Sequence, residues 1–406
     1  MKMQLSGLSV MVVEDHSFQR RVALRLLEEL GLTTLSEAGD GKAALAALEK
    51  AAVPPDVVLV DLDLPEMDGI EFIGHVASRK LARAVALTSA LDPALLNTVQ
   101  GMTRAYGLRV LGVIEKPLTT SKLAEVLGAF HNIEDALVAE PDIEVRPDML
   151  RHGLDVDEFE PFFQPKVELS TGHVVGVEAL ARWHHGGRII GPTRFVSIFE
   201  REGLIDAFTE RMLSRACRWR KRWAQQGVEL KVAVNISMLN LTKVDAADRY
   251  QQIVIDNGVK PRDIVLEITE SSVMSEAAHA LNVLARLRLK GFGLSIDDFG
   301  TGYSSLSQLS QIPFTELKID QGFVTGAVRQ QRKRAVVEAS LDLARKLQLT
   351  AVAEGVETVD EWQMLAELGC QLAQGFLIAP ALPGDELLHA IREWRAPEFA
   401  TKKNPV

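Results

Sequence analysis

Carboxylates, a threonine and a lysine recur at the ends of apolar runs in the first third of this sequence. Glu14 and Asp15 follow the first such run, Asp61 and Thr88 end later runs, and Lys116 follows another. Carboxylates gathered at one edge of a parallel sheet can hold a Mg²⁺ ion, which prefers hard oxygen ligands. Such an ion and a lysine can neutralise a phosphoryl group as it transfers to an aspartate, and a hydroxyl can then bind the phosphate.

A larger group of polar residues marks strand ends further along the chain. It is rich in oxygen donors, and its members are Glu178, Asn235, Glu267, Glu270, Asp297, Asp298, Lys318, Asp320, Glu354, Glu357 and Gln374. The strand ends of a β/α barrel converge on one rim, where active sites form. A set without Cys or His favours Mg²⁺ or Mn²⁺ over Zn²⁺. Adjacent Asp297 and Asp298 can serve two ions, an arrangement suited to the attack of water on a phosphodiester.

The elements that position the first group alternate between strand and helix. Apolar strands are expected within 8–15, 56–69, 84–90 and 110–117, and helical periodicity covers 16–31, 40–51 and 121–130. Apolar strands separated by helices predict a parallel sheet covered on both faces. Sites in such sheets lie at the carboxyl ends of the strands. This part of the α/β chain is therefore expected to be a flavodoxin-like (βα)5 unit.

The same alternation continues on a larger scale after residue 150. Strands are expected at 159–169, 174–183, 230–237, 263–271, 292–300, 316–324, 350–358 and 370–379. Eight strands in about 245 residues match the size of a β/α barrel. Because only the short link STGH joins the first two, they are expected to form an antiparallel hairpin. The expected fold is a modified (β/α)8 TIM-type barrel with an antiparallel first strand.

Length and composition narrow the class of protein. The chain has 406 residues, of which 47% are hydrophobic and 25% charged, as in a globular protein of two or three domains. The expected division is a domain over 1–130, an acidic linker over 131–149, a domain over 150–396 and a tail over 397–406. A net charge of −10 argues against a protein that coats DNA. No signal peptide or membrane-spanning run is expected, and two widely spaced cysteines indicate a reducing cytoplasm.

The first group of residues resembles the receiver domain of response regulators over about residues 6–130. Besides the strand-end acids, the resemblance rests on the spacing from Asp61 through Pro65 to Met67-Asp68-Gly69, and on Lys116-Pro117. The roles that it implies are phosphorylation of Asp61, binding of one Mg²⁺ by Glu14, Asp15 and Asp61, a switch hydroxyl on Thr88, and pairing of Lys116 with the phosphate.

One position departs from the receiver pattern. Val113 stands three residues before the lysine, where receivers usually carry Tyr or Phe as the side chain that reports phosphorylation. The chemistry of phosphate transfer is complete, but the usual aromatic switch is missing. A receiver that acts in oligomerisation or docking without phosphate therefore stays open as an alternative.

The second group resembles the EAL-domain family of cyclic di-GMP phosphodiesterases over about residues 150–395. The motif that names the family is present as Glu178-Ala179-Leu180, and DDFGTGYSSL occupies residues 297–306 without a gap. The resemblance implies hydrolysis of cyclic di-GMP to linear pGpG with Mg²⁺ or Mn²⁺, two ions being expected in the barrel site. The implied roles are metal binding by Glu178, Asn235, Glu267, Asp297 and Asp298; catalysis by the general base Glu354 and by Lys318; substrate binding by Gln164, Leu180, Arg182 and Gln374; support by Asp320 and Glu357; and anchoring of the loop 299–305 by Glu270.

Together the two resemblances predict a cytoplasmic two-component response regulator whose phosphodiesterase is controlled by phosphorylation of Asp61. The expected partners are cyclic di-GMP, a sensor histidine kinase or phosphotransfer protein, and further copies of the chain, with no DNA and no membrane. Two alternatives stay open: a cyclic di-GMP receptor that does not cleave its ligand, and a scaffold that neither binds nor cleaves it. The complete set of metal ligands and the base favours the enzyme.

Overall fold

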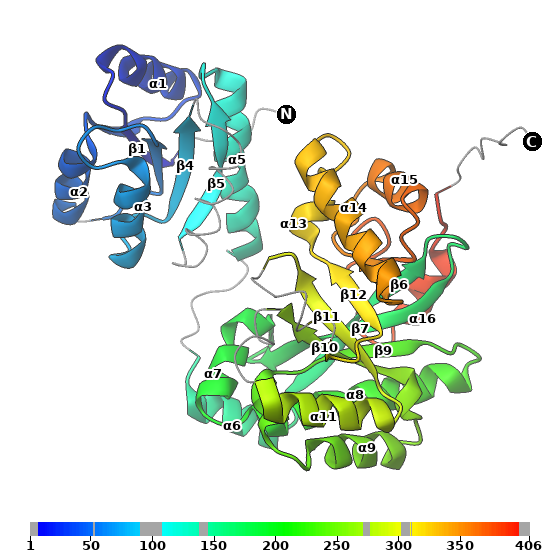
Figure 1. Ribbon diagram of the computed structural model, residues 1–406. Coiled ribbons are helices and arrows are strands. Elements are labelled where there is room, and N and C mark those ends of the chain that lie inside the picture. Colours follow the sequence, from blue (N-terminus) through cyan, green and yellow to red (C-terminus); the bar gives the residue numbers. More distant parts are fainter. Residues whose placement is uncertain are drawn as a thin grey trace, which may run out of the picture. The chain divides into compact units, whose positions relative to one another are not determined.

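The computed structural model describes residues 7–51, 53–89, 108–137, 145–270, 277–301, 309 and 311–397. Contacts divide the chain into two compact units, Met1–Asp142 and Ile143–Val406 (Figure 1). In the described residues, no helix combines the length and the apolar character needed to cross a bilayer.

The first unit is a five-stranded parallel sheet between two layers of helices. The strands follow the order β2-β1-β3-β4-β5, and all their pairings are parallel. Separate apolar clusters cover the two faces, one around Phe72 and Ile73 and the other around Leu27 and Leu127. The flavodoxin-like prediction is confirmed. The elements are β1 Ser9–Val13, α1 Ser17–Glu29, β2 Thr34–Ala38, α2 Gly41–Lys50, β3 Val57–Asp61, α3 Gly69–Ser78, β4 Ala84–Ser89, β5 Arg109–Glu115 and α5 Thr120–Leu137.

Helix α5 runs further than its periodicity predicts. The pattern indicates a helix over 121–130, whereas the helix continues to Leu137, inside the segment expected as a linker. Helix α6 (Pro147–Asp155) begins before the end of that segment, with a proline at its first position and Asp148 in its first turn. Both features favour helix initiation, because proline has no amide hydrogen to satisfy there and an acid complements the helix dipole.

The second unit is a closed barrel. Its eight-membered ring runs β6-β14-β13-β12-β11-β10-β9-β7 and closes through the pairing of β6 with β7. Strand β6 is antiparallel to both of its neighbours, and the other neighbours in the ring pair in parallel. The predicted TIM-type barrel with an antiparallel first strand is confirmed. Its strands are β6 Phe159–Glu168, β7 Val174–His185, β8 Arg188–Ile190, β9 Lys231–Asn235, β10 Ile264–Thr269, β11 Gly293–Phe299, β12 Glu316–Ile319, β13 Thr350–Ala353 and β14 Leu372–Ala373.

Helices cover the outside of this barrel. They pack buried side chains such as Leu213 of α8, Leu284 of α11 and Val337 of α14 against the strands. The helices after α6 are α7 Val196–Arg201, α8 Ile205–Gln225, α9 Ala246–Asp256, α11 Ala277–Leu289, α13 Gln321–Val324, α14 Gln331–Lys346, α15 Val359–Glu367 and α16 Leu387–Glu393, with 3₁₀ turns at η1 Pro192–Arg194, η2 Met238–Thr242 and η3 Pro261–Asp263.

Three strands are shorter than their apolar runs predict. The run 316–324 contains only β12, because the Asp320 side chain accepts the amide hydrogen of Gly322 at 2.9 Å and starts helix α13. The runs 350–358 and 370–379 contain only β13 and β14, and each strand ends where a polar residue of the rim follows. Strand β8, which pairs with β7 outside the ring, was not predicted.

Candidate active site

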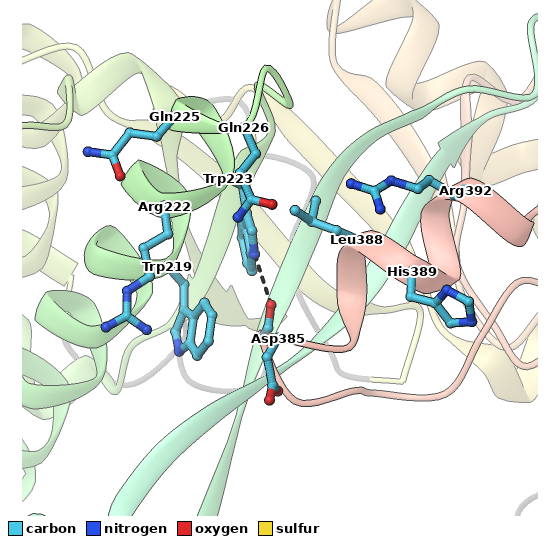
Figure 2. A pocket seen from close by; sticks show the side chains of 10 residues that line it. Trp219, Arg222, Trp223, Gln225, Gln226, Asp385, Leu388, His389 and Arg392 are labelled. Atoms are coloured by element: carbon cyan, nitrogen blue, oxygen red, sulfur yellow. Dashed lines mark hydrogen bonds between the residues drawn. The ribbon is translucent and has the colours of Figure 1, made fainter.

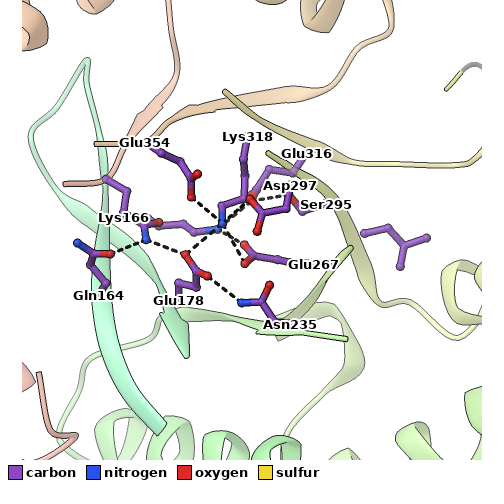
Figure 3. Close-up of polar contacts among 12 residues, drawn as sticks. Gln164, Lys166, Glu178, Asn235, Glu267, Ser295, Asp297, Glu316, Lys318 and Glu354 are labelled. Atoms are coloured by element: carbon purple, nitrogen blue, oxygen red, sulfur yellow. Dashed lines mark hydrogen bonds and ion pairs between the residues drawn. The ribbon is translucent and has the colours of Figure 1, made fainter. Parts of the chain in front are cut away.

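The polar residues predicted to share a rim come together there. Glu178 lies on β7, Asn235 ends β9, Glu267 lies on β10, Asp297 on β11 and Lys318 on β12 (Figure 3). Glu354 and Gln374 directly follow β13 and β14. Because the strands that carry these residues run parallel to one another, their carboxyl ends face the same side, so the barrel itself gathers these side chains.

Lys318 is the centre of the group. Its Nζ atom lies 2.7 Å from Glu354 Oε1, 2.9 Å from Asp297 Oδ1, and 3.1 Å from Oε2 of both Glu178 and Glu267. Its side chain is 1% exposed. Burial alone would lower the pKa of this ammonium, but the surrounding carboxylates raise it well above its usual value. Lys318 is therefore a fixed positive charge among acids that lie on, or directly after, four different strands.

The pKa values of these acids are shifted in different directions. Burial, reinforced by the charge of Glu178, raises the pKa of Glu267 well above its usual value. Burial also raises the pKa of Glu354, to about 7, although Lys318 opposes it. For Glu178 the two lysines Lys318 and Lys166 outweigh burial, so its pKa falls below the usual range. So many buried carboxylates need further positive charge to stay ionised together.

Divalent ions would supply that charge, and the donors fit them. Carboxylate oxygens of Glu178, Glu267 and Asp297 lie within 4.8 Å of one another, and so do those of Asp297, Asp298 and Glu354. Asp297 belongs to both groups, and all the donors are hard oxygen atoms of the kind that Mg²⁺ and Mn²⁺ prefer. Asn235 lies beside the first group and donates its amide hydrogen to Glu178 Oε1 at 2.8 Å.

A β-bulge brings the two adjacent aspartates to the same site. Ile296 pairs with Leu317 and Phe299 with Ile319, so Asp297 and Asp298 together face one residue of β12. In a regular strand, adjacent side chains point to opposite faces, and a bulge relaxes that rule. Asp298 adopts a left-handed backbone conformation, with φ of 55°. Burial, reinforced by the charge of Asp297, raises the pKa of Asp298 to about 6.

The rim opens into a cavity of about 410 Å³. The four residues predicted to contact substrate, Gln164, Leu180, Arg182 and Gln374, all line it. Gln374 donates to Gln164 Oε1 at 2.9 Å and to Glu178 Oε2 at 2.7 Å, and its own buried Oε1 has no hydrogen-bond partner in the described structure. This oxygen is left available to a ligand. Sequence reasoning did not identify Gln321, Phe376 and Pro380, which also line the cavity.

The supporting residues occupy the surroundings of this cavity. Glu357 is exposed and lines it, whereas Asp320 caps helix α13. Glu270 Oε2 accepts the amide hydrogen of Gly300 at 2.8 Å, which ties the end of β10 to the start of the loop after β11. Of the predicted loop 299–305, residues 302–305 lie outside the described residues, as does the end of DDFGTGYSSL.

Sequence reasoning also missed a buried polar layer below the rim. Lys166, Ser295 and Glu316 each lie two positions from a residue that was identified: Lys166 follows Gln164 on β6, whereas Ser295 and Glu316 precede Asp297 and Lys318. On a strand, residues two apart share a face. A charged or hydroxyl residue at that spacing was the signal that could have revealed this layer.

A second hollow, of about 450 Å³, lies between helices α8 and α16 (Figure 2). Trp223 is one of the residues that line it, and its Nε1 donates to the carbonyl of Gly384 at 2.9 Å. Arg222 lies over the ring of Trp219. Asp385 is the one acid among its lining residues. This hollow therefore lacks the carboxylate cluster that characterises the rim.

In the first unit, Lys116 connects two of the predicted acids. Its Nζ atom lies 2.5 Å from Asp61 Oδ2 and 2.9 Å from Glu14 Oε2. Asp61 pairs with Thr88 across β3 and β4, so the carboxylate and the hydroxyl end neighbouring strands. Asp15 Oδ1 lies 2.8 Å from His16 Nδ1. One side-chain ligand atom from each of Glu14, Asp15 and His16 lies within 4.8 Å of the other two. The five predicted residues thus share one edge of the sheet.

Two further features shape this edge. A Cβ atom on Gly69 would lie 2.5 Å from the backbone oxygen of Asp61, so the turn after β3 requires glycine where α3 begins. Val113, the residue that replaces the expected aromatic, is partly buried on β5 and packs against the apolar cluster of that face.

Comparisons with known proteins agree with both resemblances. The model of the EAL domain matches residues 148–381, and that of the response regulator receiver domain matches residues 10–128. Cyclic di-GMP phosphodiesterase RocR of Pseudomonas aeruginosa is 34% identical over 388 residues, which is 95% of this chain and 98% of RocR. The bifunctional diguanylate cyclase/cyclic di-GMP phosphodiesterase MucR of the same organism is 39% identical over 60% of this chain, which spans only 36% of MucR.

A solved structure shows the same barrel. The structure titled PaMucR phosphodiesterase, c-di-GMP complex, superposes with a TM-score of 0.56 and 39% identity, covering 59% of this chain and 98% of that one.

Proposed function

Because the chain belongs to the EAL-domain family and carries a response regulator receiver domain before that domain, we propose that it hydrolyses cyclic di-GMP to linear pGpG under the control of its receiver. RocR, which is named a cyclic di-GMP phosphodiesterase, matches across both parts of the chain. The observation that carries the proposal is the cluster of four carboxylates around Lys318 at the base of an open cavity.

In this proposal the acidic cluster holds two divalent ions, Mg²⁺ or Mn²⁺. Glu178, Glu267 and Asp297, with the amide of Asn235, would hold one, while Asp297 and Asp298 would serve the other. Bound ions would supply the positive charge that stabilises both the entering and the leaving oxygen of a phosphodiester. The short distances among these oxygens support this assignment, and the metals themselves are part of the proposal.

Glu354 is the proposed general base. It lines the cavity, its ammonium partner Lys318 fixes its position, and its pKa of about 7 suits a group that must both accept and release a proton near neutral pH. Lys318 would orient Glu354 and place positive charge near the phosphate. Gln164, Leu180, Arg182 and Gln374 are the proposed substrate contacts, with Asp320 and Glu357 in support.

Control by the receiver is proposed to begin with phosphorylation of Asp61 by a histidine kinase or phosphotransfer protein. Glu14, Asp15 and Asp61 would hold one Mg²⁺ there, and Lys116 and Thr88 would bind the new phosphate. Phosphorylation of Asp61 would move the contact of Lys116 from the carboxylate to the phosphate and bias a switch between two states. Further copies of the chain stay among the expected partners.

The experiment that tests the proposal is incubation of the full chain with cyclic di-GMP and Mg²⁺ or Mn²⁺, followed by chromatography of the nucleotides. Conversion to pGpG supports the enzyme. Binding of cyclic di-GMP without conversion in either metal, with or without a phosphodonor, would show instead a receptor without catalytic activity.

A further inference from the structure

The buried polar layer lies inside the barrel, below the rim. It consists of Lys166 on β6, Ser295 on β11 and Glu316 on β12, all three buried (Figure 3). Barrel interiors are normally filled with branched apolar side chains. A buried ion pair is seldom more stabilising than apolar residues of the same volume. Stability of the fold therefore does not account for charges at this depth.

Strand register places this layer beside one of the acids of the rim. Glu267 pairs with Ser295 across β10 and β11, and Ser295 pairs with Glu316 across β11 and β12. The three residues are consequently neighbours on adjacent strands. Lys166 reaches them from β6, the antiparallel strand of the ring.

The contacts of Lys166 converge on Glu267. Its Nζ atom lies 2.7 Å from Glu267 Oε1 and 2.9 Å from Glu316 Oε1, and the latter oxygen also accepts from Ser295 Oγ at 3.2 Å. The other oxygen of Glu267, Oε2, lies 3.1 Å from Lys318. Each oxygen of this carboxylate thus contacts a different lysine. Lys166 and Glu316 do not line the substrate cavity, and the rim acid that Lys166 contacts directly is Glu267.

We propose that Lys166 and Glu316 are positioning residues that hold the carboxylate of Glu267 ready to bind a divalent ion. Glu316 and Ser295 fix the ammonium of Lys166, and Lys166 fixes Glu267 in orientation. A metal ligand held by such outer contacts binds its ion more tightly, and loss of one contact commonly costs about 10-fold to 100-fold in affinity. This inference rests on the proposed function, since it assigns Glu267 to a metal.

The test measures metal binding without substrate. Mn²⁺ is titrated by calorimetry into the wild type, Lys166→Met and the double variant Lys166→Met/Glu316→Met, each also carrying Asp15→Asn so that the proposed receiver ion does not contribute. Lys166→Met is expected to weaken Mn²⁺ binding by at least about 10-fold. The double variant removes Glu316 together with the lysine, so the remaining former partner of Lys166 is Glu267, which Lys318 still contacts. If Lys166 positions Glu267, the double variant should unfold at a temperature close to that of the wild type and still bind Mn²⁺ weakly. If Lys166 and Glu316 have only a structural role, the double variant should bind Mn²⁺ with wild-type affinity.

Two more proteins keep the test decisive if the methionine variants do not fold. Glu316→Gln keeps the shape of the side chain and is expected to weaken Mn²⁺ binding by a smaller factor than Lys166→Met does, because Lys166 then loses only its second charged partner. Arg220→Met removes the cation of a half-buried ion pair with Asp263, away from the rim, and is expected to bind Mn²⁺ as the wild type does.

The outcomes separate this inference from the proposed function. Wild-type affinity in Glu316→Gln and in the folded lysine variants would overturn the positioning role and leave the metal site intact. A wild-type chain that binds no Mn²⁺ would overturn the metal assignment in the proposed function, and the positioning role with it.

Discussion

The Nζ atom of Lys318 lies 2.7 Å from Oε1 of Glu354, so the proposed base of the reaction is paired with a buried cation. The same ammonium contacts Asp297 at 2.9 Å, which belongs to both groups of acids that could hold an ion. One lysine on β12 thus links the base to the proposed metal ligands. Loss of either partner should therefore affect the chemical step more than the affinity for substrate.

Substitution of Glu354 tests that link. Glu354→Gln keeps the shape of the side chain but cannot accept a proton, so kcat is expected to fall by about 10²-fold to 10⁴-fold. Cyclic di-GMP binding, measured at equilibrium, should be retained. Glu367→Gln, which alters an exposed acid of α15, is the matched control and should leave kcat unchanged. Retained turnover in Glu354→Gln would exclude this residue as the base.

Metal binding should stabilise the chain measurably. At about 100 times the dissociation constant, Mg²⁺ or Mn²⁺ should raise the free energy of unfolding by about 2.7 kcal/mol relative to chelator-treated protein. Asp297→Asn removes an oxygen charge that both acidic groups of the barrel share, so the part of this gain that comes from the barrel should vanish, and the part that comes from the receiver ion should remain. Unfolding with and without metal measures this gain in stability. Asp256→Asn, which alters an exposed acid, serves as the control. An equal metal-induced gain in Asp297→Asn would contradict the assignment.

Control by the receiver should depend on Asp61. Acetyl phosphate is expected to modify the wild type and to change its turnover of cyclic di-GMP, and Asp61→Asn should abolish both effects. Asp63→Asn is a close control, because this exposed acid lies two residues away. Intact-mass measurement and chromatography of the product follow the two effects. Modification of Asp61 with no change in turnover would refute control by phosphorylation and favour a receiver that acts only in docking.

The glycine that begins helix α3 should not tolerate a side chain. In Gly69→Ala the new methyl group would lie 2.5 Å from the backbone oxygen of Asp61, so overpacking should destabilise the chain by about 1–3 kcal/mol. Gly74→Ala in the same helix meets no atom within 4 Å and should stabilise it by up to about 1 kcal/mol. Denaturant unfolding measures both, and equal effects of the two substitutions would show that the close contact does not govern stability.

An acid outside the site should make stability depend on pH. Burial would raise the pKa of Asp206, but hydrogen bonds from Lys243 and Asn240 and the charge of Arg249 outweigh it and lower the pKa. A pKa lower in the folded than in the unfolded state means that ionised Asp206 stabilises the fold at pH values above its unfolded pKa of about 3.9.

That contribution should disappear as pH falls through the folded pKa. At pH 7, Asp206→Asn is expected to cost about 0.5–1 kcal/mol, a value that allows for solvent screening of a partly exposed pair. Unfolding curves of wild type and variant should converge below pH 4. A difference that stays constant down to pH 3 would show that the charge of Asp206 is not the cause.

Residues at strand ends were the most predictable part of the molecule. Asp61 ends β3, Asn235 ends β9 and Glu354 directly follows β13, and parallel β/α topology fixes where such ends meet. The barrel could be predicted for the same reason, since apolar runs alternate with helices along the chain. Pairing of β6 with β7 followed from a link too short for a crossover.

The sequence was less informative where contacts between distant residues decide the structure. Lys166 and Glu316 are separated by 150 positions, and only ring closure brings them together around Glu267. The bulge at Asp297 and Asp298 depends on the register with β12, which no local pattern specifies. Strands β13 and β14 are short because the chain leaves the ring at Glu354 and Gln374 to form the cavity wall, so apolar runs that continue past these residues suggested longer strands.

The most direct test of the central claim compares turnover of cyclic di-GMP by the wild type and by Glu178→Ala, in Mg²⁺ and in Mn²⁺, with the products separated by chromatography. Glu178 accepts hydrogen bonds from Asn235, Lys318 and Gln374, so it joins the proposed metal ligands to the substrate cavity. The account predicts conversion to pGpG by the wild type and none by Glu178→Ala. Equal conversion by a folded Glu178→Ala protein would contradict it, because the reaction would then not take place at this rim.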